Sequence, residues 1–375
     1  MKVLTNSFSH KADPIELLRL VSYYSKKADS LENFVFFDIE TTGFSPKNSM
    51  CYLIGAVFFE NGQLTMTQWF ADTPDSETAL LRSFLTFLSD FQCMIHFNGD
   101  HFDIPFLRER CQLLEVNDAL MTSLTDCESI DVFKLIKSCH SLLTLDNYKQ
   151  KTLEQFLGIH RQDQYNGGEL IAIYKDYVIS HEKTAEELLL LHNRDDICGL
   201  YAIFPAVSYR RIYDGAFSIQ SCEINEAVNY EGTLQKELLL TGQLDTPFPT
   251  AVSIQKGICR IWLKEYTLRF QIPLFEGELK LFYPDYKNYY YLPEEDCAMH
   301  KSVASYVDKN HREQAKAATC YTKVQGLFLP GYNSTTPVLK TAYSDSVFWT
   351  KLEESFLQHA DMQLSYIKEI LKTIL

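Results

Sequence analysis

Short, uninterrupted apolar runs near the start of the chain predict strands buried on both faces. Two of these runs are separated by a segment that contains Asn61-Gly62, a strong signal for a β-hairpin. Elsewhere, apolar residues recur at helical spacing. The elements predicted in this part are, in order, strands at 34–38, 52–59 and 64–70, a helix at 75–91, a strand at 93–97 and a helix at 104–114. The chain therefore opens with a meander that gives way to alternating helices and strands.

Helical segments dominate after a short strand-like run at 130–132. Apolar spacing predicts them at 152–157, 168–178 and 184–207. In the last segment, Thr184 is followed three residues later by Glu187, a capping-box pattern that predicts Thr184 as the N-cap.

The pattern changes near residue 209 to alternating, aromatic-rich segments. These predict four strands and two helices, namely strands at 257–266, 268–274, 278–282 and 288–292, and helices at 294–307 and 349–375. We therefore expect an N-terminal extension (1–30), a first domain (31–208) and an α+β accessory domain of unknown role (209–375). No Pro/Gly/Ser-rich linker separates the two domains, so we expect them to pack together.

The composition is typical of a globular protein without a membrane span. Of the 375 residues, 46% are hydrophobic and 22% are charged, mean hydropathy is −0.16, and no long apolar run occurs. The first residues show neither an apolar signal core nor an Arg-rich pattern. The ten cysteines have no Cys-x-x-Cys spacing, which favours reduced thiols. We expect a cytoplasmic protein.

The net charge of −14 argues against a protein that coats nucleic acid by charge alone. This charge is unevenly distributed, with −12 in residues 1–200 and −2 in residues 201–375. A solubilising surface accounts for most of these carboxylates. The remaining question is whether a few of them converge.

Two carboxylates stand at the end of the most hydrophobic predicted strand, in the segment Asp38-Ile39-Glu40. Period-two alternation places Asp38 and Glu40 on the same side of an extended backbone. Two like charges so close are costly unless a cation lies between them, as in oxygen-rich Mg²⁺ or Mn²⁺ sites. The alternative is a strand that ends in two solvated acids.

Two further segments carry candidate site residues. Asp103 follows the strand at 93–97 and directly precedes a predicted helix, so it is a candidate metal ligand or simply an N-cap. His192 and Asp196 are four residues apart on a helix and share one face. A lone histidine in that position is usually structural, but this one accompanies two other acidic segments.

These three segments, in this order, resemble the sequence motifs of the DEDD 3′–5′ exonucleases within the ribonuclease H-like superfamily. Residues 38–43 resemble the first motif, residues 98–103 the second, and His192 with Asp196 the third. The chain is most similar to the bacterial YprB-like branch, whose pattern is also echoed at 131–133, 152–158 and 166–169. The likeness covers about residues 30–205. It implies an α/β fold, with a three-layer ribonuclease H-like domain that has a mixed central sheet.

The resemblance also implies a nuclease that hydrolyses DNA or RNA, acting on a single-stranded 3′ end through two Mg²⁺ or Mn²⁺ ions. The implied metal ligands, which with His192 form the catalytic set, are Asp38, Glu40, Asp103 and Asp196. The implied substrate contacts are Thr41, Thr42, Gly43, Asn98 and Phe102, although an aromatic residue in the position of Phe102 is equally typical of a core.

His192 departs from the family pattern. In the two common subtypes, the last Asp is preceded by Tyr with three intervening residues or by His with four. His192 stands at the tyrosine spacing from Asp196. The departure leaves open whether His192 acts as a base or is structural.

The second half matches no known family function. Residues 280–291 interleave tyrosines with lysines, and Lys301 and Arg312 follow, a mixture that suits single-stranded nucleic acid. The alternative is a tyrosine-rich strand in an ordinary sheet. Two other functions remain open for the whole chain: a non-catalytic nucleic-acid-binding or scaffolding protein, and a metal-dependent endonuclease.

Overall fold

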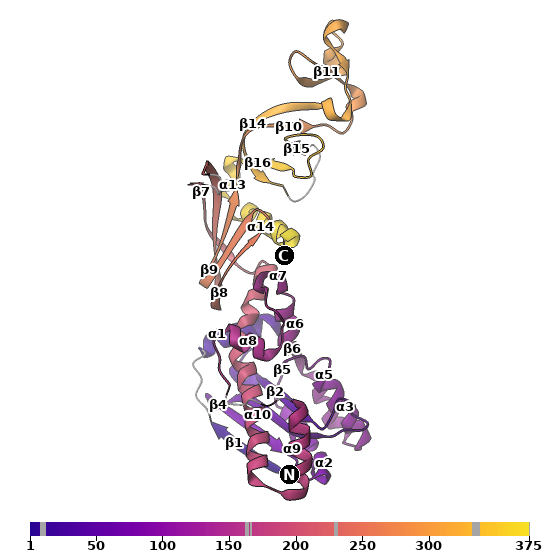
Figure 1. Ribbon diagram of the computed structural model, residues 1–375, viewed down its shortest axis with the longest axis vertical. Helices are drawn as coiled ribbons and strands as arrows, with labels where there is room; N and C mark the ends of the chain where they lie inside the picture. The colour runs from indigo at the N-terminus through magenta and orange to yellow at the C-terminus, as the bar shows by residue number, and fades with distance from the viewer. Residues whose placement is uncertain (8–12, 162–164, 166, 229–231, 332–337, 375) are drawn as a thin grey trace. The chain divides into compact units, whose positions relative to one another are not determined.

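The computed structural model describes residues 1–7, 13–161, 165, 167–228, 232–331 and 338–374 (Figure 1). Asn166, which begins the segment at 166–169, lies outside these residues. The chain divides into two compact units. The first comprises Met1–Arg211 and Thr246–Thr250, and the second comprises Ile212–Asp245 and Ala251–Leu375.

The first unit is built on a six-stranded sheet in the order β1-β4-β3-β2-β5-β6. Its strands are β1 (Lys2–Ser7), β2 (Phe34–Thr41), β3 (Cys51–Glu60), β4 (Gln63–Phe70), β5 (Cys93–His96) and β6 (Glu128–Asp131). Strand β2 pairs antiparallel with β3 and parallel with β5, and β5 pairs parallel with β6. The sheet is therefore mixed, as predicted. Asn61 and Gly62 have positive φ angles and form the expected hairpin turn.

Helices cover both faces of this sheet. The unit contains α1 (Pro14–Tyr24), α2 (Glu77–Leu88), α3 (Asp103–Leu113), α4 (Asp118–Met121), α5 (Ser123–Asp126), α6 (Val132–Lys137), α7 (His140–Leu143), α8 (Gln150–Phe156), α9 (Gly167–Ser180) and α10 (Lys183–Ile203). Phe37 packs on Phe84 of α2, whereas its neighbour Phe36 packs on Tyr201 of α10. Because adjacent strand residues point to opposite faces, α2 and α10 lie on opposite sides of β2. The three-layer arrangement is confirmed (Figure 1).

Two details of the first unit differ from expectation. Helix α10 begins at Lys183 with Glu182 as its N-cap, so Thr184 lies inside the first turn and does not cap it. Residues 1–30, expected as an extension, contribute the edge strand β1, which pairs with β4, and helix α1.

The second unit is mostly β-structure. Its elements are β7 (Ser218–Val228), β8 (Leu234–Lys256), β9 (Cys259–Pro273), β10 (Phe275–Phe282), β11 (Tyr289–Leu292), β12 (Cys297–His300), α12 (Lys301–Ala304), β13 (Glu313–Gln314), β14 (Tyr321–Pro330), β15 (Val338–Lys340), β16 (Trp349–Lys351), α13 (Glu354–Gln358) and α14 (Ala360–Ile374). The short helix α11 (Arg210–Tyr213) contains the break between the units. Strands β7, β8 and β9 form one sheet, β12, β11 and β13 form another, and β10, β14, β16 and β15 close into a small barrel.

Three sequence predictions for this unit are corrected. The helix predicted at 294–307 is wrong, because Cys297–His300 forms β12 and pairs with β11, leaving only the single turn α12. The terminal helix predicted from 349 is shorter, since Trp349–Lys351 pairs with β14. The strands predicted at 257–266 and 268–274 are one strand, β9. Among the described residues, no helix combines the length and apolar character needed to cross a membrane.

Candidate active site

Strand β2 presents Asp38 and Glu40 to helix α10. Side chains alternate along a strand, so Phe36, Asp38 and Glu40 share one face, and Phe36 packs on Tyr201 of α10. Nearer the start of the same helix, His192 Nε2 lies 3.4 Å from Glu40 Oε1. The candidate site therefore lies on the sheet face that packs on α10, at the point where the apolar residues of β2 end.

The third predicted segment meets the first at this point. His192 Nε2 also lies 3.0 Å from Asp196 Oδ2, as expected for residues one helical turn apart. The Glu40 and Asp196 carboxylate oxygens only accept hydrogen bonds, so we assign a hydrogen to Nε2 in these two contacts. Glu40, His192 and Asp196 each place a potential ligand atom within 4.8 Å of the others.

Asp38 lies beside an amide whose orientation is fixed. Asn193 Nδ2 donates to Asp38 Oδ2 at 3.3 Å, while Gln68 Nε2 donates to Asn193 Oδ1 at 2.9 Å. Burial raises the pKa of Asp38 well above its ordinary value, and nearby carboxylates add to the shift, those of Asp196, Asp103 and Glu40. In the absence of a cation, this carboxyl group is therefore held in a strongly negative, poorly solvated environment.

Asp103 is the first residue of α3, and only 5% of it is exposed. Phe102 occupies the N-cap position, so the predicted alternative role of Asp103 as the N-cap is wrong. Burial raises the pKa of Asp103 to about 7, against the opposing charge of His96. The backbone passes very close to both side chains, because a Cβ on Gly99 would lie 2.6 Å from His96 Nδ1 and 2.8 Å from Asp103 Oδ2.

Asp196 is contacted by an arginine that sequence reasoning missed. Arg161 Nη1 donates to Asp196 Oδ1, and the rest of its guanidinium group binds Glu154. Burial favours the neutral form of Asp196, but the hydrogen bond from His192 and the charge of Arg161 outweigh it and lower the pKa of Asp196. Glu154 lies in the 152–158 segment, whereas nothing in the sequence pattern distinguished Arg161.

The predicted substrate-contact residues shape the loops next to these carboxylates. Thr41 Oγ1 donates to the Gly43 carbonyl at 2.9 Å, and Thr42 Oγ1 accepts from the Met50 amide at 3.0 Å. Gly43 also allows a close approach, since a Cβ there would lie 2.6 Å from Ser49 Oγ.

Asn98 and Phe102 lie in the loop between β5 and α3. Asn98 adopts a positive φ of 63°, and its amide donates to Asp131 Oδ1 at 3.0 Å. Phe102 is half-buried and meets Phe44, which is 89% exposed, edge to face at 6.1 Å. Contact of Asn98 and Phe102 with a substrate stays a prediction.

A second group of titratable residues, His96, Asp100 and Asp131, lies beside Asp103. Asp100 binds Lys134 Nζ at 2.6 Å and accepts from Ser129 Oγ, while Asp131 caps α6. Hydrogen bonds, the one with His96 first, lower the pKa of Asp100 despite its partial burial. Because Lys134 pairs with Asp100 and Asp131 caps α6, we interpret this group as structural support for the β5 and β6 strand ends.

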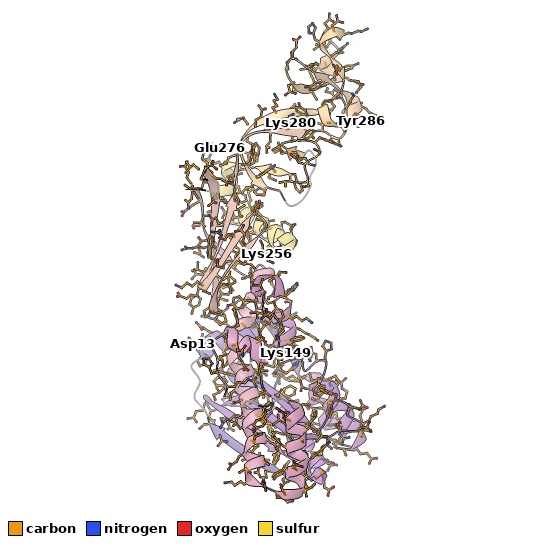
Figure 2. All side chains as sticks on the ribbon, in the orientation of Figure 1. Asp13, Lys149, Lys256, Glu276, Lys280 and Tyr286 are labelled. Carbon is orange, nitrogen blue, oxygen red and sulfur yellow. The ribbon has the colours of Figure 1, made fainter. Side chains whose placement is uncertain are left out.

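The aromatic and basic segment of the second unit forms a sheet strand. Tyr289–Leu292 is β11, paired on both sides by β12 and β13. Lys301 Nζ and the Arg312 guanidinium both lie over the Tyr290 ring, at 5.2 and 4.7 Å from its centre. Lys280, labelled in Figure 2, covers the ring of Tyr321 in the same way at 4.2 Å.

Comparison with known proteins identifies a superfamily whose model matches the first unit. Residues 35–207 match the family model of the RNase_H superfamily. This span contains all the predicted site residues, and the predicted ribonuclease H-like fold is confirmed. No curated protein matches the chain.

Solved structures show distant similarity. A family B DNA polymerase from Pyrobaculum calidifontis is 14% identical (TM-score 0.37), covering 68% of this chain and 35% of its own. E. coli exonuclease I in complex with a dT13 oligonucleotide is 13% identical (TM-score 0.30), covering 56% and 54%. A product-bound exonuclease I is 10% identical (TM-score 0.34), covering 78% and 64%. The chain thus spans about a third to two thirds of these proteins.

Proposed function

We propose that this protein is a DEDD-type 3′–5′ exonuclease that hydrolyses phosphodiester bonds of DNA or RNA. The observation that carries the proposal is that carboxylates from three separate segments, on β2, α3 and α10, lie near enough to Asp38 to raise its pKa, and that Glu40 and Asp196 meet at His192. The match of residues 35–207 to the RNase_H superfamily supports it.

The residues present fit divalent metal ions. Carboxylate oxygens are the ligands that Mg²⁺ and Mn²⁺ prefer. Burial raises the pKa of Asp38 most, and the neighbouring carboxylates raise it further with negative charge that a cation would relieve. We propose that Asp38, Glu40, Asp103 and Asp196 hold two such ions. When bound, the ions supply an activated water and stabilise the negative charge on the leaving 3′-oxygen.

The chain's own groups have distinct tasks in this proposal. His192 holds a hydrogen at Nε2 between Glu40 and Asp196, which keeps the two carboxylates together. In the other neutral tautomer, with the hydrogen on Nδ1, Nε2 would be free to accept a proton from water. The loop at 41–43 and the side chains of Asn98 and Phe102 bind the terminal nucleotide.

We propose that the chain belongs to the YprB-like branch, on its resemblance in the segments at 131–133 and 152–158. We further propose a single-stranded 3′ end as substrate and the cytoplasm as location. All ten cysteines are free thiols, and burial raises the pKa of several of them, Cys93 to about 12. Such thiols suit a reducing compartment.

The test is an Asp38→Asn variant, which removes the charge but keeps the size of the side chain. We expect the rate of Mn²⁺-dependent nucleotide release to fall by about 1,000-fold or more, since a metal ligand is worth several kcal/mol of transition-state stabilisation. Release is followed on 5′-labelled single-stranded DNA and RNA. The matched control is Glu60→Gln, an exposed carboxylate at the hairpin end of β3, which should keep the wild-type rate.

The products of the wild-type protein decide between the functional classes. Stepwise shortening from the 3′ end supports the proposal. Internal cuts indicate an endonuclease, and oligonucleotide binding without metal-dependent cleavage indicates a scaffolding role. Either of these last two results would overturn it.

A further inference from the structure

Among the described residues, the side chains of three bind Asp196, and two of these come from outside its own helix. Arg161 Nη1 donates to Asp196 Oδ1, and His192 Nε2 faces Asp196 Oδ2 at 3.0 Å. Gln150 Nε2, from α8, donates to the main-chain carbonyl of Asp196 at 2.7 Å. The position of the helix backbone and the rotation of the carboxylate are therefore fixed separately.

Arg161 is itself anchored by a buried carboxylate. Its Nε and Nη2 groups both bind Glu154, the second at 2.6 Å, in the two-pronged geometry that suits a guanidinium group. Glu154 is 1% exposed, and the Arg161 side chain is 9% exposed. Helix α10 makes room for this pair, because a Cβ on Gly199 would lie 2.1 Å from Glu154 Oε1.

If Arg161 served only as a counter-ion for Glu154, it would not need a third contact with Asp196. Two of the guanidinium N–H groups satisfy Glu154, and the Nη1 group is directed at Asp196. Gln150 repeats the pattern, binding Glu154 Oε1 at 3.0 Å and the Asp196 carbonyl at 2.7 Å. Both polar side chains thus link the same buried carboxylate to the same residue of α10.

We propose that Gln150, Glu154 and Arg161 form a positioning clamp for Asp196. Because Arg161 occupies Oδ1, the clamp directs the other oxygen, Oδ2, toward His192 and the site. This inference rests on the proposed function of the site. Arg161 is a positioning residue, since its burial and its bonds to Glu154 keep it from the substrate.

An Arg161→Gln variant tests the clamp by two readouts. The first is the rise in Tm on adding Mn²⁺ without substrate, which reports metal binding alone. We expect this rise to be largely lost, because groups that orient a metal ligand typically contribute about 10- to 100-fold in metal affinity or activity. The second is kinetic: kcat should fall about 10- to 100-fold, while KM for the oligonucleotide stays unchanged.

Arg161→Gln leaves Glu154 buried without a counter-ion, so a second variant without that unpaired charge is needed for comparison. The Glu154→Gln/Arg161→Gln double variant removes both charges and restores a neutral, hydrogen-bonding pair. We expect it to recover the Tm of the metal-free wild type but not the Mn²⁺ response or kcat. Arg161→Lys, which keeps the charge but not the two-pronged geometry, should recover part of each.

Recovery of the Mn²⁺ response in the double variant would overturn the clamp and leave Arg161 as a counter-ion for Glu154. A Mn²⁺ response stronger than wild type in Arg161→Gln would also overturn it, because Arg161 would then compete with the metal. Failure of the proposed function is separate, because the wild-type protein would then show neither a Mn²⁺ response nor cleavage.

Discussion

Gly55 of β3 faces Asp38 of β2 across the sheet and leaves room for a side chain from α10. The two residues are register partners, and a Cβ on Gly55 would lie 2.3 Å from Asn193 Oδ1. Asn193 is fully buried and donates to Asp38. A methyl group at residue 55 must therefore displace the amide that orients a proposed metal ligand.

We expect Gly55→Ala to lower Mn²⁺-dependent nucleotide release by about 10- to 100-fold, the usual cost of disturbing a group that orients a ligand. The extra methyl group should also lower the free energy of unfolding by about 1–3 kcal/mol, as overpacking does. Rate measurements and chemical denaturation check the two effects. Gly167→Ala, where a Cβ meets nothing within 4 Å, is the control. A variant that retains the wild-type rate would contradict the role of Asn193.

For single residues, the sequence indicated candidates by their chemistry and by their position at the ends of predicted strands and helices. The acids of residues 38–40 were found because they end an apolar strand, and the structure brings Glu40 together with His192 and Asp196. Arg161 was missed because an arginine 35 positions from its partner carries no local signal. Its role depends on a contact that only the folded chain creates.

Among the elements, a strand marked by a continuous apolar run was predicted, whereas one set by its pairing partner was not. Strand β2 follows from a continuous apolar run that suits a central strand. The segment predicted as a helix at 294–307 contains β12, whose backbone pairs with β11. Apolar spacing does not reveal such a partner, because tertiary pairing overrides local preference.

The turn between β11 and β12 depends on one carboxylate, that of Asp296. Its Oδ1 accepts hydrogen bonds from Tyr291 of β11 and Tyr321 of β14, and its Oδ2 lies 2.7 Å from Lys323 Nζ. The hydrogen bond from Lys323 and those from the two tyrosines lower the pKa of Asp296. A carboxylate with a lowered pKa in the folded state stabilises that state at every pH above its unfolded value.

We expect Asp296→Asn to lower Tm at neutral pH by about 2–4 °C. The difference from wild type should persist down to about pH 4, the ordinary range of an aspartate, and then shrink as acid protonates the wild-type carboxylate. Thermal melts between about pH 3 and pH 7 measure it. Glu295→Gln, an exposed neighbour, should show no such trend. A difference that is independent of pH would contradict an ionic role for Asp296.

For the whole molecule, the net negative charge is concentrated in the first 200 residues. Residues 1–200 carry −12, including the carboxylates of the candidate site, while residues 201–375 carry only −2. In the second unit, Tyr290 already contacts two cations, Lys301 and Arg312. If this surface binds nucleic acid, it recognises phosphate charge more than the faces of bases.

We expect the Lys301→Glu/Arg312→Glu double variant to bind single-stranded oligonucleotide at least about tenfold more weakly at low salt. Each lost phosphate contact removes counterion release, so the slope of log affinity against log salt should flatten by about 1 to 2. Fluorescence anisotropy at several salt concentrations measures both quantities. Lys256→Glu/Lys264→Glu, on β8 and β9 of the same unit, makes the same change in net charge and should have little effect.

If the two double variants weaken binding equally, the effect is one of overall charge. If neither changes affinity or slope, β11 and its cations are structural, as the ordinary-sheet interpretation of the sequence predicts.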